Sequence, residues 1–183
     1  MAGQPDLTTE RLRLRPFTLA DAPDVQRLAG DRDIAATTAA IPHPYEAGMA
    51  EAWIGQHAGR FASGESVVFA ITHRSDGALL CAIGLELNAE QQRAELGYWV
   101  GKPYWNAGYC TEAARAVVRY AFEALGLRRV FAYHFGRNPA SGRVMHKIGM
   151  RREGTLRQHT IKWGAIDDLE VYGLLRAEAA KET

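Results

Sequence analysis

The chain has 183 residues and a mass of 20.2 kDa, which suits one domain because single hydrophobic cores commonly span about 100–200 residues. Lys and Arg total 22 against 21 Asp and Glu, so the chain lacks the basic footprint of a dedicated nucleic-acid-binding protein. Its two cysteines cannot form a disulfide scaffold and are not spaced as metal ligands, and no apolar run approaches membrane-spanning length. We therefore expect a soluble, cytoplasmic protein without metal, nucleic acid or membrane partners, in which residues 1–183 form one domain with a core at about 8–176.

The first third of the chain is expected to contain one strand and two helices. Residues 11–15 alternate Arg and Leu, which indicates a strand whose leucines face the core. Residues 18–30 begin with a capping pattern and end at a glycine, so they are expected to form a helix. Residues 31–44 have no clear period and are interpreted as a loop with at most one helical turn, of a length that often borders a ligand. Residues 46–61 are expected to form the second helix.

The middle of the chain changes to β-structure. Apolar runs at 66–73 and 78–87 flank an Asp-Gly pair, which is typical of a hairpin, and 93–100 follows as a third strand. From Thr111 the apolar residues recur at helical spacing, and Gly126 ends this helix. The remaining elements are expected to be a strand at 129–135, a short helix at 139–148 and a hairpin of strands at 155–162 and 166–175. This order predicts an α/β or mixed α+β domain.

Residues 102–108 join the third strand of this region to the long helix, and this connection is expected to bind an anion. The first turn of a helix has unpaired N–H groups and a partial positive charge. Ala107 and Gly108 are small enough to let a ligand reach the backbone. We interpret the connection as a diphosphate site, and an ordinary strand-to-helix turn is the alternative. The spacing matches neither the dinucleotide-binding glycine motif nor the P-loop.

Two stretches around this connection, Gly97-Tyr-Trp-Val100 and Tyr104-Trp-Asn-Ala-Gly-Tyr-Cys-Thr-Glu-Ala113, resemble the acetyl-CoA motif of the GNAT superfamily of N-acetyltransferases. Three further blocks resemble the same family in the same order, at residues 9–15, 138–150 and 168–175. The most similar branch is the one that includes ribosomal-protein N-terminal (alanine/serine) acetyltransferases. The resemblance implies a single-domain GNAT fold, with a mixed, mostly antiparallel sheet, splayed central strands and helices on both faces.

The resemblance also implies an acyltransferase that moves an acetyl group from acetyl-CoA to a primary amine by direct transfer in a ternary complex. A protein N-terminus, an amino acid, a polyamine and an aminoglycoside are all compatible acceptors, and the protein is expected to be a monomer or a homodimer. Two alternatives stay open at this point: a non-catalytic acyl-CoA-binding or sensing module, and a purely structural or interaction domain.

The resemblance assigns the coenzyme site residue by residue. The backbone of Tyr98, Trp99 and Val100 would pair with the amides of the pantetheine arm. Cys110 stands where the family usually has Gly or Ala, a change small enough for the fold to accept. The diphosphate would lie on the N–H groups of residues 106–111. The loop that binds the coenzyme would comprise Trp105, Asn106, Ala107, Gly108, Tyr109, Cys110 and Thr111.

Further along the chain, Asn138 and Ser141 would lie near the pantetheine arm and the sulfur. Arg143 and Lys147 are spaced to share one helix face, and the 3′-phosphate of coenzyme A is a plausible partner for this like-charge pair, with solvated surface charges as the alternative. Met145 stands where many members of the superfamily have the tyrosine that protonates the leaving thiolate, and a thioether cannot donate a proton. Ser141 is therefore the expected proton donor.

The acceptor amine arrives mostly protonated, so a base or a water relay must remove a proton before transfer. Glu95 is the leading candidate, because it precedes the strand segment that would hold the coenzyme. Strand alternation places it on the opposite face from its neighbours, and that face could also simply meet solvent. His134, His159 and water are the alternatives.

Overall fold

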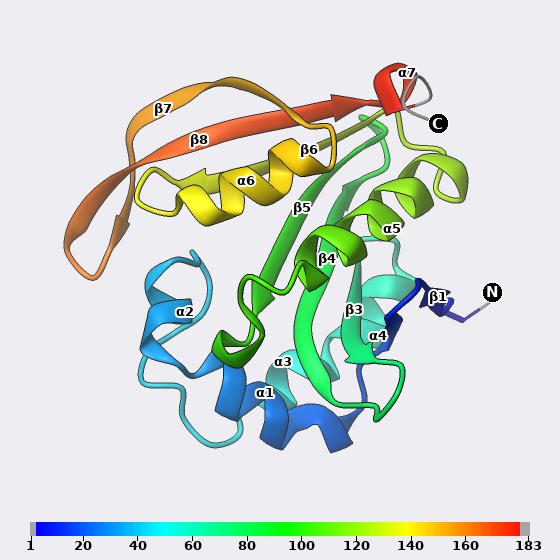
Figure 1. Ribbon diagram of the computed structural model, residues 1–183, viewed down its shortest axis with the longest axis vertical. Helices are drawn as coiled ribbons and strands as arrows, with labels where there is room; N and C mark the ends of the chain where they lie inside the picture. The colour runs from blue at the N-terminus through cyan, green and yellow to red at the C-terminus, as the bar shows by residue number, and fades with distance from the viewer. Residues whose placement is uncertain (1–2, 180–183) are drawn as a thin grey trace.

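The computed structural model describes residues 3–179, which are built on one eight-stranded sheet in the order β1-β2-β3-β4-β5-β6-β8-β7 (Figure 1). Neighbouring strands are antiparallel except β5 and β6, which run parallel. The mixed, mostly antiparallel sheet that the resemblance implies is therefore confirmed. The strands are β1 (Leu7–Thr8), β2 (Leu12–Pro16), β3 (Ser66–His73), β4 (Leu79–Asn88), β5 (Arg93–Val100), β6 (Arg129–Phe135), β7 (Arg151–Lys162) and β8 (Ala165–Leu175).

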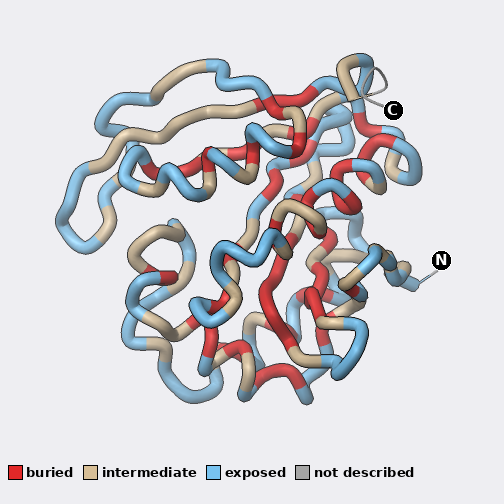
Figure 2. The backbone as a smooth tube through the Cα atoms, in the orientation of Figure 1, coloured by how far each residue is buried: buried red, intermediate tan, exposed pale blue. Residues whose placement is uncertain are grey.

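Helices cover both faces of this sheet, as expected. Successive residues of β3 point to opposite faces. Phe69 packs with α5 in one core, whereas Ala70 packs with α1 and α3 in the other. Figure 2 shows the buried backbone running through β3, β4 and one side of α5. The helices are α1 (Ala22–Ala29), α2 (Arg32–Ala36), α3 (Met49–Gly55), α4 (His57–Ala62), α5 (Tyr109–Glu123), α6 (Pro139–Lys147) and α7 (Arg176–Ala179), with 3-10 turns η1 (Leu19–Asp21) and η2 (Lys102–Tyr104).

Four predicted elements differ from the structure, and β1, η2 and α7 were not predicted. The helix expected at 18–30 is the 3-10 turn η1 followed by α1. The single helix expected at 46–61 is two helices: α3 starts at Met49, after Gly48 with φ +86°, and it separates from α4 at Gln56, whose N–H donates to Trp53 three residues back. The helix α5 starts at Tyr109, two residues early, because Gly108 with φ +81° is its N-cap. Strand β7 starts at residue 151 rather than 155. Its first residues pair with β8 across a bulge, and a bulge interrupts the alternation of polar and apolar residues from which a strand is predicted. Among the described residues, no helix has the length and apolar character needed to cross a membrane.

Strands β5 and β6 separate soon after they begin. They pair only where Arg93–Glu95 faces Arg129–Phe131, although β5 continues to Val100 and β6 to Phe135. In Figure 1 the two strands diverge below this point, with α5 beside β5 and α6 beside β6. The splayed central strands implied by the resemblance are therefore confirmed, and they leave the backbone of residues 96–100 open on one side.

The β7–β8 hairpin reaches across to the segment after α2 (Figure 1). The Lys162 ammonium donates hydrogen bonds to the carbonyl oxygens of Ile41 at 2.7 Å and Ala39 at 3.2 Å. Arg137, which follows β6, donates to the carbonyl oxygen of Ala36 at 3.0 Å. These bonds hold the loop expected at 31–44 against the second half of the chain.

Candidate active site

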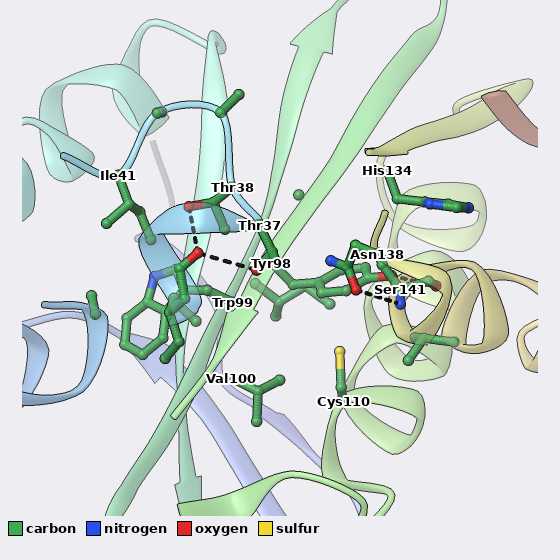
Figure 3. Close-up of a pocket in the computed structure, with 18 of the residues that line it drawn as sticks. Thr37, Thr38, Ile41, Tyr98, Trp99, Val100, Cys110, His134, Asn138 and Ser141 are labelled. Atoms are coloured by element: carbon green, nitrogen blue, oxygen red, sulfur yellow. Dashed lines mark hydrogen bonds between the residues drawn. The ribbon is translucent and has the colours of Figure 1, made fainter. Parts of the chain in front are cut away.

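A cavity of about 1110 Å³ opens where β5 and β6 separate, and it is lined by β4, β5, β6, α6, the start of α5 and the segment after α2. Strand β5 divides the cavity because its alternate side chains point to opposite faces. Tyr98 packs on the α5 side, and Trp99 packs in the core formed with α1 and α3. Figure 3 shows the same division: Tyr98, Cys110, Asn138 and Ser141 gather on one side of β5, and Trp99 lies on the other with Ile41.

On the α5 side, the chain presents a run of free amides. None of the six backbone N–H groups from Asn106 to Thr111 donates a hydrogen bond to another group of residues 3–179. Asn106 has φ +60° and Gly108 has φ +81°, and the start of α5 has no side-chain cap. Unpaired N–H groups at a helix N-terminus attract an anion, so the residues present fit a bound diphosphate.

Glu112 ties this loop to the start of the chain, a role that sequence reasoning missed. Its carboxylate accepts hydrogen bonds from the Thr9 hydroxyl at 2.6 Å, the Arg11 backbone N–H at 2.9 Å and Arg11 Nε at 2.7 Å. Arg11 in turn donates to the carbonyl oxygen of Ala107 at 3.1 Å. Burial alone would raise the pKa of the Glu112 carboxyl, but the bonds from Thr9 and Arg11 outweigh burial and lower it. An acidic residue in the first turn of the helix was the available signal.

The open edge of β5 offers fewer backbone groups than the sequence suggested. In an antiparallel pair, every second residue directs its backbone N–H and C=O groups toward the partner strand. Gly101 N–H donates to the Leu80 carbonyl on β4, so the backbone of Trp99, two residues earlier, also faces β4. Only Tyr98 and Val100 of the three expected residues present their backbone to the cleft. The Val100 carbonyl already accepts a hydrogen bond from the indole Nε1 of Trp105 at 2.8 Å. The expected backbone role of Trp99 is therefore corrected: this residue lines the cavity with its side chain.

Ser141, on α6, is held in place from two sides (Figure 3). Its hydroxyl lies 2.8 Å from the hydroxyl of Tyr98, and its backbone N–H donates to Oδ1 of Asn138 at 3.3 Å. Burial raises the pKa of Tyr98 well above its ordinary value, so the phenol stays protonated and can donate a hydrogen bond. Met145 is only 1% exposed and lies in the core shared with α5. Burial likewise raises the pKa of the Cys110 thiol, to about 12, so Cys110 is not a nucleophile at neutral pH.

Two cations lie at the outer end of the α5 side. Arg143 and Lys147 are exposed, line the cavity and have no acidic partner within residues 3–179. Lys147 also borders a second hollow of about 410 Å³ with Arg11 and Arg115. Unpaired cations beside the free amides of the loop suit an additional phosphate group.

On the opposite side of β5, Glu95 lies next to Glu86 of β4, its cross-strand partner. The Arg60 guanidinium binds Glu86 with contacts of 2.7 and 3.3 Å, whereas Glu95 has no hydrogen-bond or ion-pair partner among residues 3–179. Partial burial and the charge of Glu86 raise the pKa of Glu95. Both carboxylates line the cavity.

The two histidines considered as bases are placed differently from Glu95. His134 is buried on the α6 side, where its Nδ1 lies 2.8 Å from the carbonyl oxygen of Phe135 and its ring packs against Gly142. His159 is exposed and does not line the cavity. Ala107 does not line it either, although its neighbours do. The structure thus brings together the other expected site residues and leaves His159 outside.

Comparison with known proteins places this geometry in a family. The acetyltransferase (GNAT) domain family matches residues 11–151. The N-acetyltransferase YoaA of Bacillus subtilis is 31% identical over 173 residues, which cover 94% of this chain and 97% of that protein. The ribosomal-protein-serine acetyltransferase of Escherichia coli is 30% identical over 79 residues, 43% of this chain and 44% of that protein.

A solved structure shows the same fold. The acetyltransferase of the GNAT family from Bacillus anthracis superposes with a TM-score of 0.84 at 27% identity, covering 95% of this chain and all of that one. The relatives include a ribosomal-protein acetyltransferase, in agreement with the branch that the sequence motifs indicate. This chain belongs to the GNAT family of acetyl-CoA-dependent N-acetyltransferases.

Proposed function

We propose that this protein transfers the acetyl group of acetyl-CoA directly to a primary amine, either a protein N-terminus or a small molecule, in a ternary complex in the cytoplasm. The observation that carries the proposal is the division of one cavity by β5. One side has free amides, cations and a fixed serine hydroxyl, and the other has an unpaired carboxylate. The two substrates can therefore approach the open edge of β5 from opposite sides.

The coenzyme would bind along the α5 side. The N–H groups of residues 106–111 would hold the diphosphate, and Arg143 and Lys147 would hold the 3′-phosphate. The backbone of Tyr98 would pair with the pantetheine arm, with Asn138 beside it. When bound, acetyl-CoA supplies an acetyl thioester, whose carbonyl carbon accepts a nucleophile.

On the acceptor side, Glu95 would take a proton from the ammonium form of the amine. A carboxyl group with a raised pKa is better matched to proton transfer near neutral pH than an ordinary one. The amine nitrogen then forms a bond to the carbonyl carbon, and the carbon–sulfur bond breaks. The nitrogen loses its second proton to water as the amide forms, and the Ser141 hydroxyl donates a hydrogen bond to the departing thiolate, which takes up a proton from water. The free N–H of Val100 would stabilise the oxyanion.

An acceptor screen tests the proposal. Thiol release from acetyl-CoA would be followed with peptides and small amines side by side. Release with at least one amine supports catalysis, and binding of acetyl-CoA without release from any amine would favour the alternative, a non-catalytic sensing module. Ser141→Ala should lower kcat while leaving the Kd for coenzyme A unchanged. Equal losses in both quantities would make Ser141 a binding residue only.

A further inference from the structure

We infer that the acceptor is a primary amine with a single positive charge and a slender apolar group, such as a phenyl ring, next to it. This inference rests on the proposed function and names the class of its second substrate. It is carried by the shape and the charge of the part of the cavity that lies on the Glu95 side of β5.

The floor of this part has a gap between two filled positions. Three cross-strand pairs of β4 and β5 form the floor: Glu86 with Glu95, Gly84 with Gly97, and Ala82 with Trp99. The middle pair has no side chains of its own, but Val68 of β3 covers Gly84, since its Cγ2 lies 3.1 Å from where a Cβ of residue 84 would be. A Cβ atom added at Gly97 would meet no atom within 4 Å, and Gly97 does not have a positive φ, so its conformation does not require glycine. The gap therefore provides space for a substrate directly beside the Glu95 carboxylate.

The walls above this gap are mainly apolar. Ile34, Ile41, Tyr45 and Trp53 line the cavity from the segments that cover this face, together with Trp99. The hydroxyl of Thr38, which also lines it, donates to the carbonyl oxygen of Ile34 at 3.0 Å, and Thr37 donates to Asp33 in the same way. These hydroxyls are satisfied within their own helix and its end, so the walls favour an apolar group over a polyhydroxylated one.

The charges allow for one ammonium group. Glu95 is unpaired, whereas the charge of Glu86 is balanced by Arg60. At the other end, the cavity reaches Arg137, whose charge is balanced by Asp167 at 3.2 Å, and burial together with the charge of Arg137 lowers the pKa of the nearby Lys162. A second ammonium of a polyamine would find no second unpaired carboxylate among the residues that line the cavity. The cavity therefore disfavours spermidine relative to a monoamine.

The test compares 2-phenylethylamine, ethylamine, spermidine and a peptide with N-terminal phenylalanine, by kcat/KM from thiol release. The wild-type protein should prefer 2-phenylethylamine or the peptide to ethylamine and spermidine. A higher kcat/KM for 2-phenylethylamine indicates a free amine as the acceptor, and a higher kcat/KM for the peptide indicates a chain N-terminus. Gly97→Leu should reduce the preference for the aromatic acceptor over ethylamine by roughly tenfold or more, because its side chain fills the gap. Gly97→Ala should have a smaller effect of the same sign.

Gly154→Leu is the matched control, since Gly154 is also a strand glycine with nothing within 4 Å of an added Cβ but does not line the cavity. Arg60→Gln, which frees the charge of Glu86, should raise the activity with spermidine relative to 2-phenylethylamine. The stability and the coenzyme affinity of each variant would be measured by thermal shift. An unchanged acceptor ratio in Gly97→Leu, or a wild-type preference for spermidine, would overturn the inference and leave the proposed function intact. Failure of every amine to release thiol would overturn both.

Discussion

Replacement of Glu112 by alanine should destabilise the protein by about 2–5 kcal/mol. The change leaves the backbone N–H of Arg11 without its acceptor, and an unsatisfied buried donor costs about 1–3 kcal/mol. It also removes the bond from the Thr9 hydroxyl, for about 1 kcal/mol. The Arg11 side chain is 41% exposed, so its ion pair with Glu112 adds only about 0–1 kcal/mol. For a chain of this length the total corresponds to a Tm lower by roughly 4–20 °C.

The assay is urea unfolding of the wild-type protein, Glu112→Ala and Glu112→Gln at pH 7. Glutamine keeps the shape and one acceptor oxygen, so it should lose less than alanine. Because the folded state lowers the pKa of Glu112, the advantage of the wild type is present above the ordinary pKa of a carboxyl group and disappears as the pH falls through the folded pKa.

Glu112→Ala should also weaken coenzyme A binding, since Arg11 would no longer be held against Ala107 in the amide-rich loop. A loss of stability below about 1 kcal/mol at pH 7 would refute the reasoning, because it would be smaller than one unsatisfied buried donor. A difference between wild type and variant that persists undiminished at pH 3 would refute the assignment of the effect to the ionised carboxylate.

Three further predictions follow from other groups. His57 is buried, both its ring nitrogens lack a partner within residues 3–179, and burial lowers its pKa from 6.5 to about 4. The free energy of unfolding should therefore fall by up to ~3 kcal/mol as the pH falls from 6.5 to 4, because only the unfolded state binds a proton there. His57→Leu should abolish this pH dependence in urea titrations, and an unchanged dependence would contradict the prediction. Gly108→Trp should abolish the stabilisation by coenzyme A, which for the wild type is about 2.7 kcal/mol at one hundred times Kd, because the indole would occupy the path of the diphosphate and residue 108 has φ +81°. A retained stabilisation, measured by thermal shift, would move the diphosphate elsewhere. Tyr98→Phe should lower kcat without changing the Kd for coenzyme A. Because the two hydroxyls lie 2.8 Å apart, the double variant Tyr98→Phe/Ser141→Ala should have the same kcat as Ser141→Ala alone, and additive losses of kcat would show that the two hydroxyls act independently.

Local pattern was sufficient for most elements of the fold. The helix from Tyr109 and the hairpin around Asp76-Gly77 are specified by residues that are near one another in sequence, and so is the strand Arg93–Val100. The motif around Gly108 was sufficient to locate the loop of free amides, because a helix N-terminus and its preceding loop form one local unit. By contrast, the early start of β7 depends on its pairing with β8 across a bulge.

The properties of the Glu95 side of the cavity could not be predicted, because they arise from residues on different elements. Glu95 was identifiable as a carboxylate on one face of a strand, but its free charge depends on Arg60 binding Glu86 instead. The gap at Gly97 depends on which distant side chains stay away from it, since nothing lies within 4 Å of a Cβ added there. The sequence by itself determined the family, the order of elements and the position of the amide-rich loop, since these follow from local spacing. Only the tertiary structure decided which charges are neutralised and which glycines line a cavity, because strand register and long-range ion pairs join residues that no local pattern connects.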